Sequence, residues 1–238
     1  MMGKLPIPLI GNPVREIKFP KNPNLDQCIM TEEKEMAEEM HLTKGRLEAL
    51  SDGIFAFAMT LLVIGLNLPD KATLVQSNAF ALQYILALYS DFFHYVLAFL
   101  ILGAFWLSQH QQFHSVRVPD KIFIWINLVT LMFVALLPFS TSFSGDFTHA
   151  SVGAMVFEAN LFAIGMGMTC QWWYATNYNH LTESTLKPAY IRRVLMGNLI
   201  VPTVSVICFL VALTGSLWSS ALYMTLPLID YAVDRYFR

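Results

Sequence analysis

The chain has 238 residues, of which 55% are hydrophobic and 13% charged, and its formal net charge is −2. Soluble domains carry about 25% charged residues, so this composition points to a membrane protein. The weak net charge argues against a nucleic-acid-binding protein. The three cysteines, Cys28, Cys170 and Cys208, are odd in number and far apart, so they predict no disulfide framework.

The charge is unevenly distributed, and this predicts two regions. Residues 1–43 are predicted to be a polar cytoplasmic tail, rich in proline up to Pro23 and helical and solvent-facing over residues 29–45. Pro6 and Pro8 interrupt the first apolar patch, so we expect no cleaved signal peptide. Residues 44–238 are predicted to form the membrane domain.

The membrane domain is predicted to be all-α, because its apolar segments have the length of a helical bilayer crossing, about 20 residues. Between the first two crossings, residues 72–88 predict a short interfacial or extracellular helix. We expect six transmembrane helices per subunit, at residues 46–68, 90–112, 122–143, 150–172, 194–214 and 217–233.

Six crossings place both termini on one side of the membrane, and basic residues indicate which side. Nearly all lysines and arginines of the connecting segments fall on the face shared with the termini, whereas Lys71 lies opposite. Cytoplasmic segments carry the excess of basic residues, so both termini are predicted to be cytoplasmic. The expected location is the cell membrane, with the lipid bilayer as a partner.

The first predicted span carries one apolar stripe. At helical spacing, Phe57, Leu61 and Ile64 share a face, with Thr60 at its shoulder. One interpretation is a surface that contacts lipid or other helices; the other is a hydrophobic constriction on a symmetry axis, which gates by expelling water. No second copy of this span occurs in the chain, so a pore would need several subunits arranged around an axis.

The polar start of the same span carries Arg46, Ser51 and Asp52. Arg46 and Asp52 are about 240° apart around a helix, so they do not share a face. These residues are either an interfacial anchor or part of a buried network at the base of the span. Trp106 and His110 of the second span are the candidate partners, because they lie at the depth of Asp52.

Two other groups suggest different chemistry. His110 and His114 form an i,i+4 pair that could bind a metal, with interfacial polar contacts as the alternative. Glu158 lies alone in an apolar span, where a structural hydrogen bond is one interpretation, and Asp91 lies near the outer end of the second span. Such acids can carry protons in transporters, so a proton- or solute-coupled secondary transporter is the alternative function.

The segment Arg46-Leu-Glu-Ala-Leu50-Ser51-Asp52 and the helix that follows resemble the first membrane helix of the TMEM175-like potassium channels. Leu50 replaces the family's phenylalanine. Phe105-Trp106-x-x-x-His110-x-x-Phe113, Asn127 and Pro138-Phe139 are similar to the second and third spans of that family.

The resemblance implies a homotetramer of six-span subunits with a central pore lined by the first helices. It also implies potassium selectivity without a carbonyl filter loop, and the pore positions Phe57, Thr60, Leu61 and Ile64; the family usually has Ile or Leu where this chain has Phe57. We therefore expect a potassium-selective cation channel that is not an enzyme and needs no cofactor or metal. Arg46, Ser51, Asp52, Trp106 and His110 would hold the base of the first helix.

Overall fold

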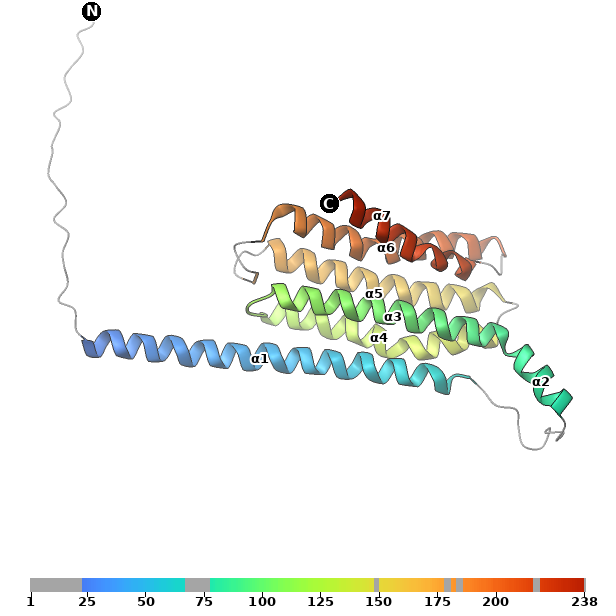
Figure 1. The fold of residues 1–238 in the computed structure, drawn as a ribbon, viewed down its shortest axis with the longest axis horizontal. Coiled ribbons are helices and arrows are strands. Elements are labelled where there is room, and N and C mark those ends of the chain that lie inside the picture. The colour runs from blue at the N-terminus through green and yellow to red at the C-terminus, as the bar shows by residue number, and fades with distance from the viewer. Residues whose placement is uncertain are drawn as a thin grey trace, which may run out of the picture. The chain divides into compact units, whose positions relative to one another are not determined.

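The computed structural model describes residues 23–66, 78–147, 150–177, 181–182, 186–215 and 219–237. Within these residues the chain is helical except at turns and at one isolated antiparallel bridge between Val116 and Thr182. The elements, labelled in Figure 1, are α1 (Pro23–Ile64), α2 (Asn78–Ala87), α3 (Tyr89–Ser115), α4 (Lys121–Asp146), α5 (Ser151–Asn177), α6 (Pro188–Leu213), the 3₁₀ helix η2 (Ser219–Thr225) and α7 (Leu226–Tyr236).

The chain divides into two compact units, Met1–Glu39 and Met40–Arg238. Helix α1 begins in the first unit and includes residues 29–45, which were predicted to be helical. The predicted boundary between residues 43 and 44 therefore falls inside α1, and the division into tail and membrane domain stays a prediction. Residues 1–22 of the predicted tail and the end of the first span, residues 67–68, lie outside the described residues.

Within the described residues, five helical segments are long and apolar enough to cross a membrane: Lys44–Ile64, Tyr89–Ser115, Lys121–Asp146, Ser151–Asn177 and Pro188–Leu213. The shortest has 21 residues. At 1.5 Å per residue it is about 31 Å long, the thickness of a bilayer core. The all-α architecture with several candidate membrane-spanning helices is thus confirmed. Each of the five segments overlaps one of the first five predicted spans, whose bounds stay a prediction. Helix α2 lies within the predicted interfacial segment 72–88.

The last predicted span, 217–233, is not one α-helix. Residues 219–225 form η2, and α7 starts at Leu226 with Pro227 in its first turn. Proline has no amide hydrogen for the carbonyl one turn earlier and favours the first turn of a new helix, which explains the change of helix type at this point. A sixth crossing stays a prediction.

Helix α5 lies between α4 and α6 and packs against both (Figure 1). Two glycines allow this close approach. A Cβ atom on Gly165 would lie 2.6 Å from Pro202 of α6, and one on Gly167 would collide with Thr130 Oγ1 of α4. Small residues let membrane helices approach closely, so these positions set the α4–α5–α6 packing.

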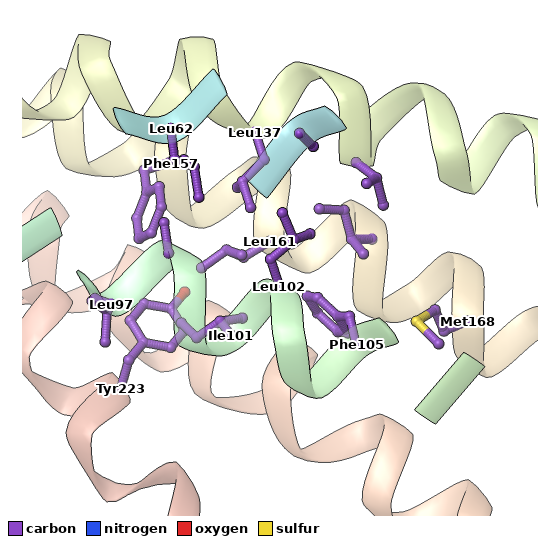
Figure 2. Close-up of a cluster of buried hydrophobic side chains, with 14 of the residues drawn as sticks. Leu62, Leu97, Ile101, Leu102, Phe105, Leu137, Phe157, Leu161, Met168 and Tyr223 are labelled. Atoms are coloured by element: carbon purple, nitrogen blue, oxygen red, sulfur yellow. The ribbon is translucent and has the colours of Figure 1, made fainter. Parts of the chain in front are cut away.

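Apolar side chains from α1, α3, α4, α5 and η2 converge in the main core. Figure 2 shows Leu62 of α1 among Leu137, Phe157 and Leu161, with Tyr223 of η2 reaching into the same cluster. All five side chains are at most 3% exposed. The core therefore includes one face of α1, which fixes the orientation of that helix against the subunit.

The connections at one end of the membrane unit are tied together. The amide of Arg117, between α3 and α4, donates to the Leu181 carbonyl at 2.8 Å. Asp120 caps α4 by accepting from the Phe123 amide at 2.8 Å, and its other carboxylate oxygen accepts from Tyr174 of α5 at 2.5 Å. A cap of this kind satisfies an amide that the helix leaves free. These contacts order the end at which the polar base of α1 lies.

Candidate ion pathway and the base of α1

The transmembrane part of α1 has a buried face. Leu47, Ser51, Phe55, Ala58 and Leu62 are each at most 6% exposed. Their spacing of three or four residues places them on one side of the helix. Everything on the opposite side is therefore the outer surface of the subunit.

The predicted pore residues occupy that outer surface and its edge. Phe57 is 64% exposed and Ile64 is 69% exposed, and Thr60 is exposed between them. Leu61 is half-buried, at the border with the buried face. Phe57, Thr60 and Ile64 thus lie on the exposed side of α1, with Leu61 at its edge. Whether they face an ion pathway stays a prediction.

The hydroxyl of Thr60 bonds within its own helix. It donates to the carbonyl of Phe57 at 2.7 Å, three residues back. Because the hydrogen is used in this bond, the oxygen lone pairs remain on the exposed side of the helix. The Thr60 oxygen is therefore a polar acceptor in the middle of an apolar surface.

Asp52 and two aromatic residues of α3 meet at the base of α1. The Trp106 indole donates from Nε1 to Asp52 Oδ1 at 2.8 Å. The His110 ring stacks on Trp106, with ring centroids 5.9 Å apart and an interplanar angle of 24°. These three predicted residues therefore form one chain of contacts between α1 and α3, with the charge-assisted bond as its strongest member.

Ser51 belongs to a separate, buried network. Its hydroxyl accepts from Asn127 Nδ2 at 3.1 Å and from Gln109 Nε2 at 3.3 Å. Asn127 Oδ1 in turn accepts from Gln109 at 2.6 Å and from Gln171 Nε2 at 3.4 Å. The network joins α1, α3, α4 and α5, and all four side chains are at most 3% exposed. Buried amides need such partners, so α1 is held at a defined height against the other helices.

The prediction of the base residues did not include Gln109 and Gln171. Both are amides near the ends of otherwise apolar spans, and this is the signal that could have identified them. Polar side chains at such positions usually have a partner on another helix. Their position in sequence could not reveal that they share Asn127 as that partner.

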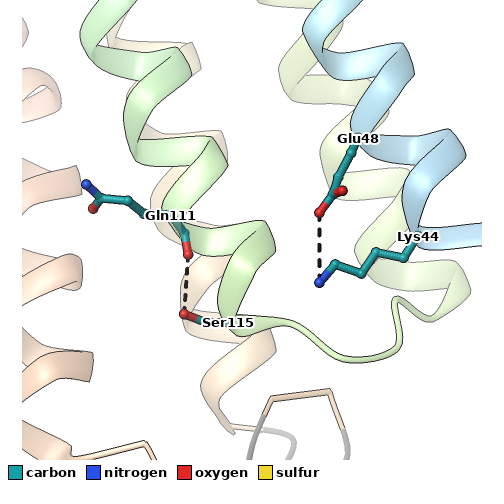
Figure 3. A network of polar contacts seen from close by, with 4 residues as sticks. All are labelled: Lys44, Glu48, Gln111 and Ser115. Atoms are coloured by element: carbon teal, nitrogen blue, oxygen red, sulfur yellow. Dashed lines mark hydrogen bonds and ion pairs between the residues drawn. The ribbon is translucent and has the colours of Figure 1, made fainter. Parts of the chain in front are cut away.

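Arg46 is exposed and makes no ion pair with any side chain that the structure describes. It is not brought together with Asp52, as its position on the helix predicted. Lys44 and Glu48, each two residues from Arg46, form an i,i+4 ion pair with 3.8 Å between Nζ and Oε1 (Figure 3). The same figure shows Ser115 of α3, which donates to the Gln111 carbonyl. The ion pair is partly exposed, and such pairs stabilise a helix only weakly.

The residues that were considered for a metal site and for a transporter lie in different parts of the subunit. His110 and His114 are exposed, and no group of three or more potential metal ligands occurs among the described residues. Glu158 is completely buried in α5. Asp91, at the start of α3, faces Asp146 and His94 instead. The two acids have different neighbours and do not form a common site.

Comparisons with known proteins show what this chain is similar to. The family model described as "Endosomal/lysosomal potassium channel TMEM175" matches residues 46–138, which contain the α1 base and its α3 and α4 partners. A protein of Streptomyces collinus named a potassium channel is 33% identical over 143 residues, which are 58% of this chain and 68% of that protein. A mouse protein named an endosomal/lysosomal proton channel, TMEM175, is 29% identical over 161 residues, 62% of this chain and 31% of the mouse protein.

A solved structure shares the fold. The crystal structure of a Chamaesiphon minutus protein, described as a homologue of the lysosomal potassium-selective channel TMEM175, aligns with a TM-score of 0.66 and 22% identity. The alignment covers 82% of this chain and 98% of that one, so the likeness extends over most of this chain and nearly all of the other. With its five long apolar helices, this chain is a multi-pass membrane protein that belongs to the TMEM175 potassium channel family.

Proposed function

We propose that this chain is the subunit of a homotetrameric, potassium-selective channel of the cell membrane, with a pore lined by α1. The observation that carries the proposal is the outer surface of α1, where Phe57 and Ile64 are more than 60% exposed although the helix is part of the subunit core. A second copy of the chain can cover part of this surface, and a ring of copies leaves the rest around an axis. The similarity to proteins named potassium channels supports potassium as the ion.

The neck of this pore would be a stack of apolar rings. Phe57, Leu61 and Ile64 follow one another at about one-turn intervals, each contributing one side chain per subunit. Narrow apolar rings expel water and thereby close a pore to ions. An ion passes when the rings are wide enough to admit it with part of its hydration shell. The chain contains no Thr-Val-Gly-Tyr-Gly segment, so we assign selectivity to this neck.

Thr60 would supply the polar contact in the neck. Its hydrogen is donated to the Phe57 carbonyl, so its oxygen is free to meet a partly dehydrated cation. Oxygen atoms are the ligands that hard cations prefer, and a ring of four hydroxyls replaces some of the lost water. Thr60 therefore tunes the preference among cations.

The base contacts would keep the neck in position. The Trp106–Asp52 bond and the buried Ser51–Asn127 bond fix α1 to α3 and α4 from two sides. A small rotation of α1 about its own helix axis would bring a different set of its exposed side chains to the pore axis. These bonds hold the rotation at which Phe57 and Ile64 face outward from the subunit.

We also propose that η2 and α7 together make the sixth crossing. A 3₁₀ helix rises about 2.0 Å per residue and an α-helix 1.5 Å, so seven plus eleven residues span about 30 Å. Asp234 near the end of α7 forms an ion pair of 2.7 Å with Arg193 near the start of α6, so the chain has returned to that end (Figure 1). Basic residues at this end support cytoplasmic termini.

The experiment is a recording from purified protein in a planar bilayer with a potassium gradient. We expect currents that reverse near the potassium equilibrium potential and that increase several-fold in the Ile64→Asn and Leu61→Asn variants, because an amide keeps water in the neck. Val129→Asn is the matched control, since Val129 is an exposed apolar residue of α4. Unchanged currents in both neck variants would place the ion pathway elsewhere, and native mass measurement tests the tetramer.

A further inference from the structure

A second feature of the subunit lies away from α1, around Glu158 of α5. Glu158 is 0% exposed, and neither of its carboxyl oxygens has a hydrogen-bond partner among the described residues. It lies seven residues into a 27-residue helix, about 10 Å from its start, and thus well inside the span. An isolated acid at such a depth needs a physical explanation.

The carboxyl group is enclosed by α6 and η2. The Ser219 hydroxyl of η2 faces it, is itself 0% exposed, and has no hydrogen-bond partner of good geometry in the described residues. Cys208 of α6 and Tyr223 of η2 are the titratable groups close to it. The Tyr223 hydroxyl already donates to Ser205 Oγ at 2.9 Å, so its hydrogen is not available to Glu158.

The other elements around α5 bring no positive charge to Glu158. Helix α4 carries its titratable side chains at its two ends, at Lys121 and Asp146. On α3, His94 packs edge-on against the ring of Phe157, with centroids 6.2 Å apart, and its charged neighbour is Asp91. On α7, Asp230 faces Asp234 and Arg193. Among the described residues, Glu158 forms no ion pair.

A bare carboxylate in these surroundings would be an uncompensated buried charge, which is among the most costly arrangements in a protein interior. A carboxylic acid is neutral and avoids this cost. We propose that Glu158 is a proton-binding site of the subunit core, and that its proton couples the docking of η2 on α5 to pH.

The proton and the docking of η2 are coupled because η2 covers the carboxyl group of Glu158. While η2 is docked, Glu158 keeps its proton, because the anion would have only a thiol and two hydroxyls for neighbours. When η2 moves away, water enters from the end of the subunit where α5 starts, about 10 Å from Glu158, and reaches the carboxyl group. The O–H bond then breaks, and the proton passes to water. Docking therefore binds one proton, and a rise in pH weakens it. The inference concerns the packing of the subunit and does not require that the protein conducts potassium.

The first test is infrared spectroscopy of the full chain in lipid nanodiscs. At neutral pH we expect a C=O stretching band of a protonated carboxyl group that disappears in the Glu158→Gln variant. Glu48→Gln is the matched control, because Glu48 is partly exposed and paired with Lys44. If Glu158→Gln removes no such band, or removes a carboxylate band instead, Glu158 is ionised and the proposal is wrong.

The second test follows the docking of η2 through Cys208, which is 0% exposed beneath Tyr223. In a Cys28→Ser, Cys170→Ser background we expect maleimide labelling of Cys208 to rise several-fold more steeply with pH in the chain with Glu158 than in the Glu158→Gln variant. A negative charge on Glu158 opposes ionisation of the nearby thiol, so a steeper rise in the chain with Glu158 reports access to Cys208 rather than thiolate formation. Parallel pH profiles would overturn the coupling.

Discussion

Helices α5 and α1 are both long and apolar, yet they are used in different ways. Half of the most apolar stretch of α5 is buried inside the subunit, whereas only 28% of that of α1 is buried. Helix α5 touches its neighbours through glycines at which no Cβ fits. Helix α1 contributes one face to the core and is fixed at its base by hydrogen bonds. Helix α5 therefore holds the subunit together, while α1 offers a surface to something outside it.

The largest effect is expected from filling the contact between α4 and α5. Gly167→Val places a branched side chain in the space that Thr130 Oγ1 already occupies. Overpacking of this kind costs about 1–3 kcal/mol or more, so the variant should lose most of its folded yield. Gly197→Ala is the control, since a Cβ atom there would have nothing within 4 Å. Size-exclusion profiles and thermal unfolding measure both; an unaffected Gly167→Val variant would disprove the tight α4–α5 contact.

The next effect concerns the buried network at the base of α1. Asn127→Leu removes the acceptor of Gln109 and Gln171 and the donor to Ser51. Gln109 keeps its bond to Ser51, whereas the buried Gln171 amide loses its acceptor at a cost of about 1–3 kcal/mol, so thermal stability should fall clearly. In Asn177→Ala, which removes an exposed amide bonded to its own helix, stability should hardly change. Equal melting temperatures of the two variants would mean that the network contributes little.

A smaller effect is expected from the contact between α1 and α3. Trp106→Phe keeps an aromatic ring for His110 to stack on but removes the donor to Asp52. A single hydrogen bond contributes about 1 kcal/mol, so stability should fall slightly. If the bond also fixes the rotation of α1, single-channel conductance should become more variable than in the parent protein. A Trp106→Phe channel with unchanged conductance would limit the bond to a structural role.

The smallest effect is expected at the ion pair of α1. Glu48→Gln removes the partner of Lys44, at a distance of 3.8 Å on a partly exposed face. Such pairs contribute less than about 0.5 kcal/mol, so melting in low salt should change little and in high salt not at all. A large shift would indicate that Glu48 has a further partner, which a double variant with Lys44→Gln would reveal.

The five long spans were predictable because bilayer thickness and hydropathy are sufficient to define them. The meeting of Asp52 with Trp106 was expected from depth alone. That Ser51 and Asp52 belong to separate networks was not expected. Neighbouring residues on a helix point about 100° apart, so Asp52 contacts Trp106 whereas Ser51 contacts Gln109 and Asn127. The change to a 3₁₀ helix at Ser219–Thr225 was also missed, since an apolar run does not specify its helix type.

By itself, the amino-acid sequence determined which segments are long and apolar enough to cross a membrane and which motif begins the first of them. Only the tertiary structure decided which side of α1 is buried, that Gln109 and Gln171 share Asn127, and that Glu158 is enclosed by α6 and η2. The physical reason is that lipid tails and protein cores are both apolar. A membrane helix is therefore apolar on all sides, and its sequence lacks the contrast that marks the buried face of a soluble helix.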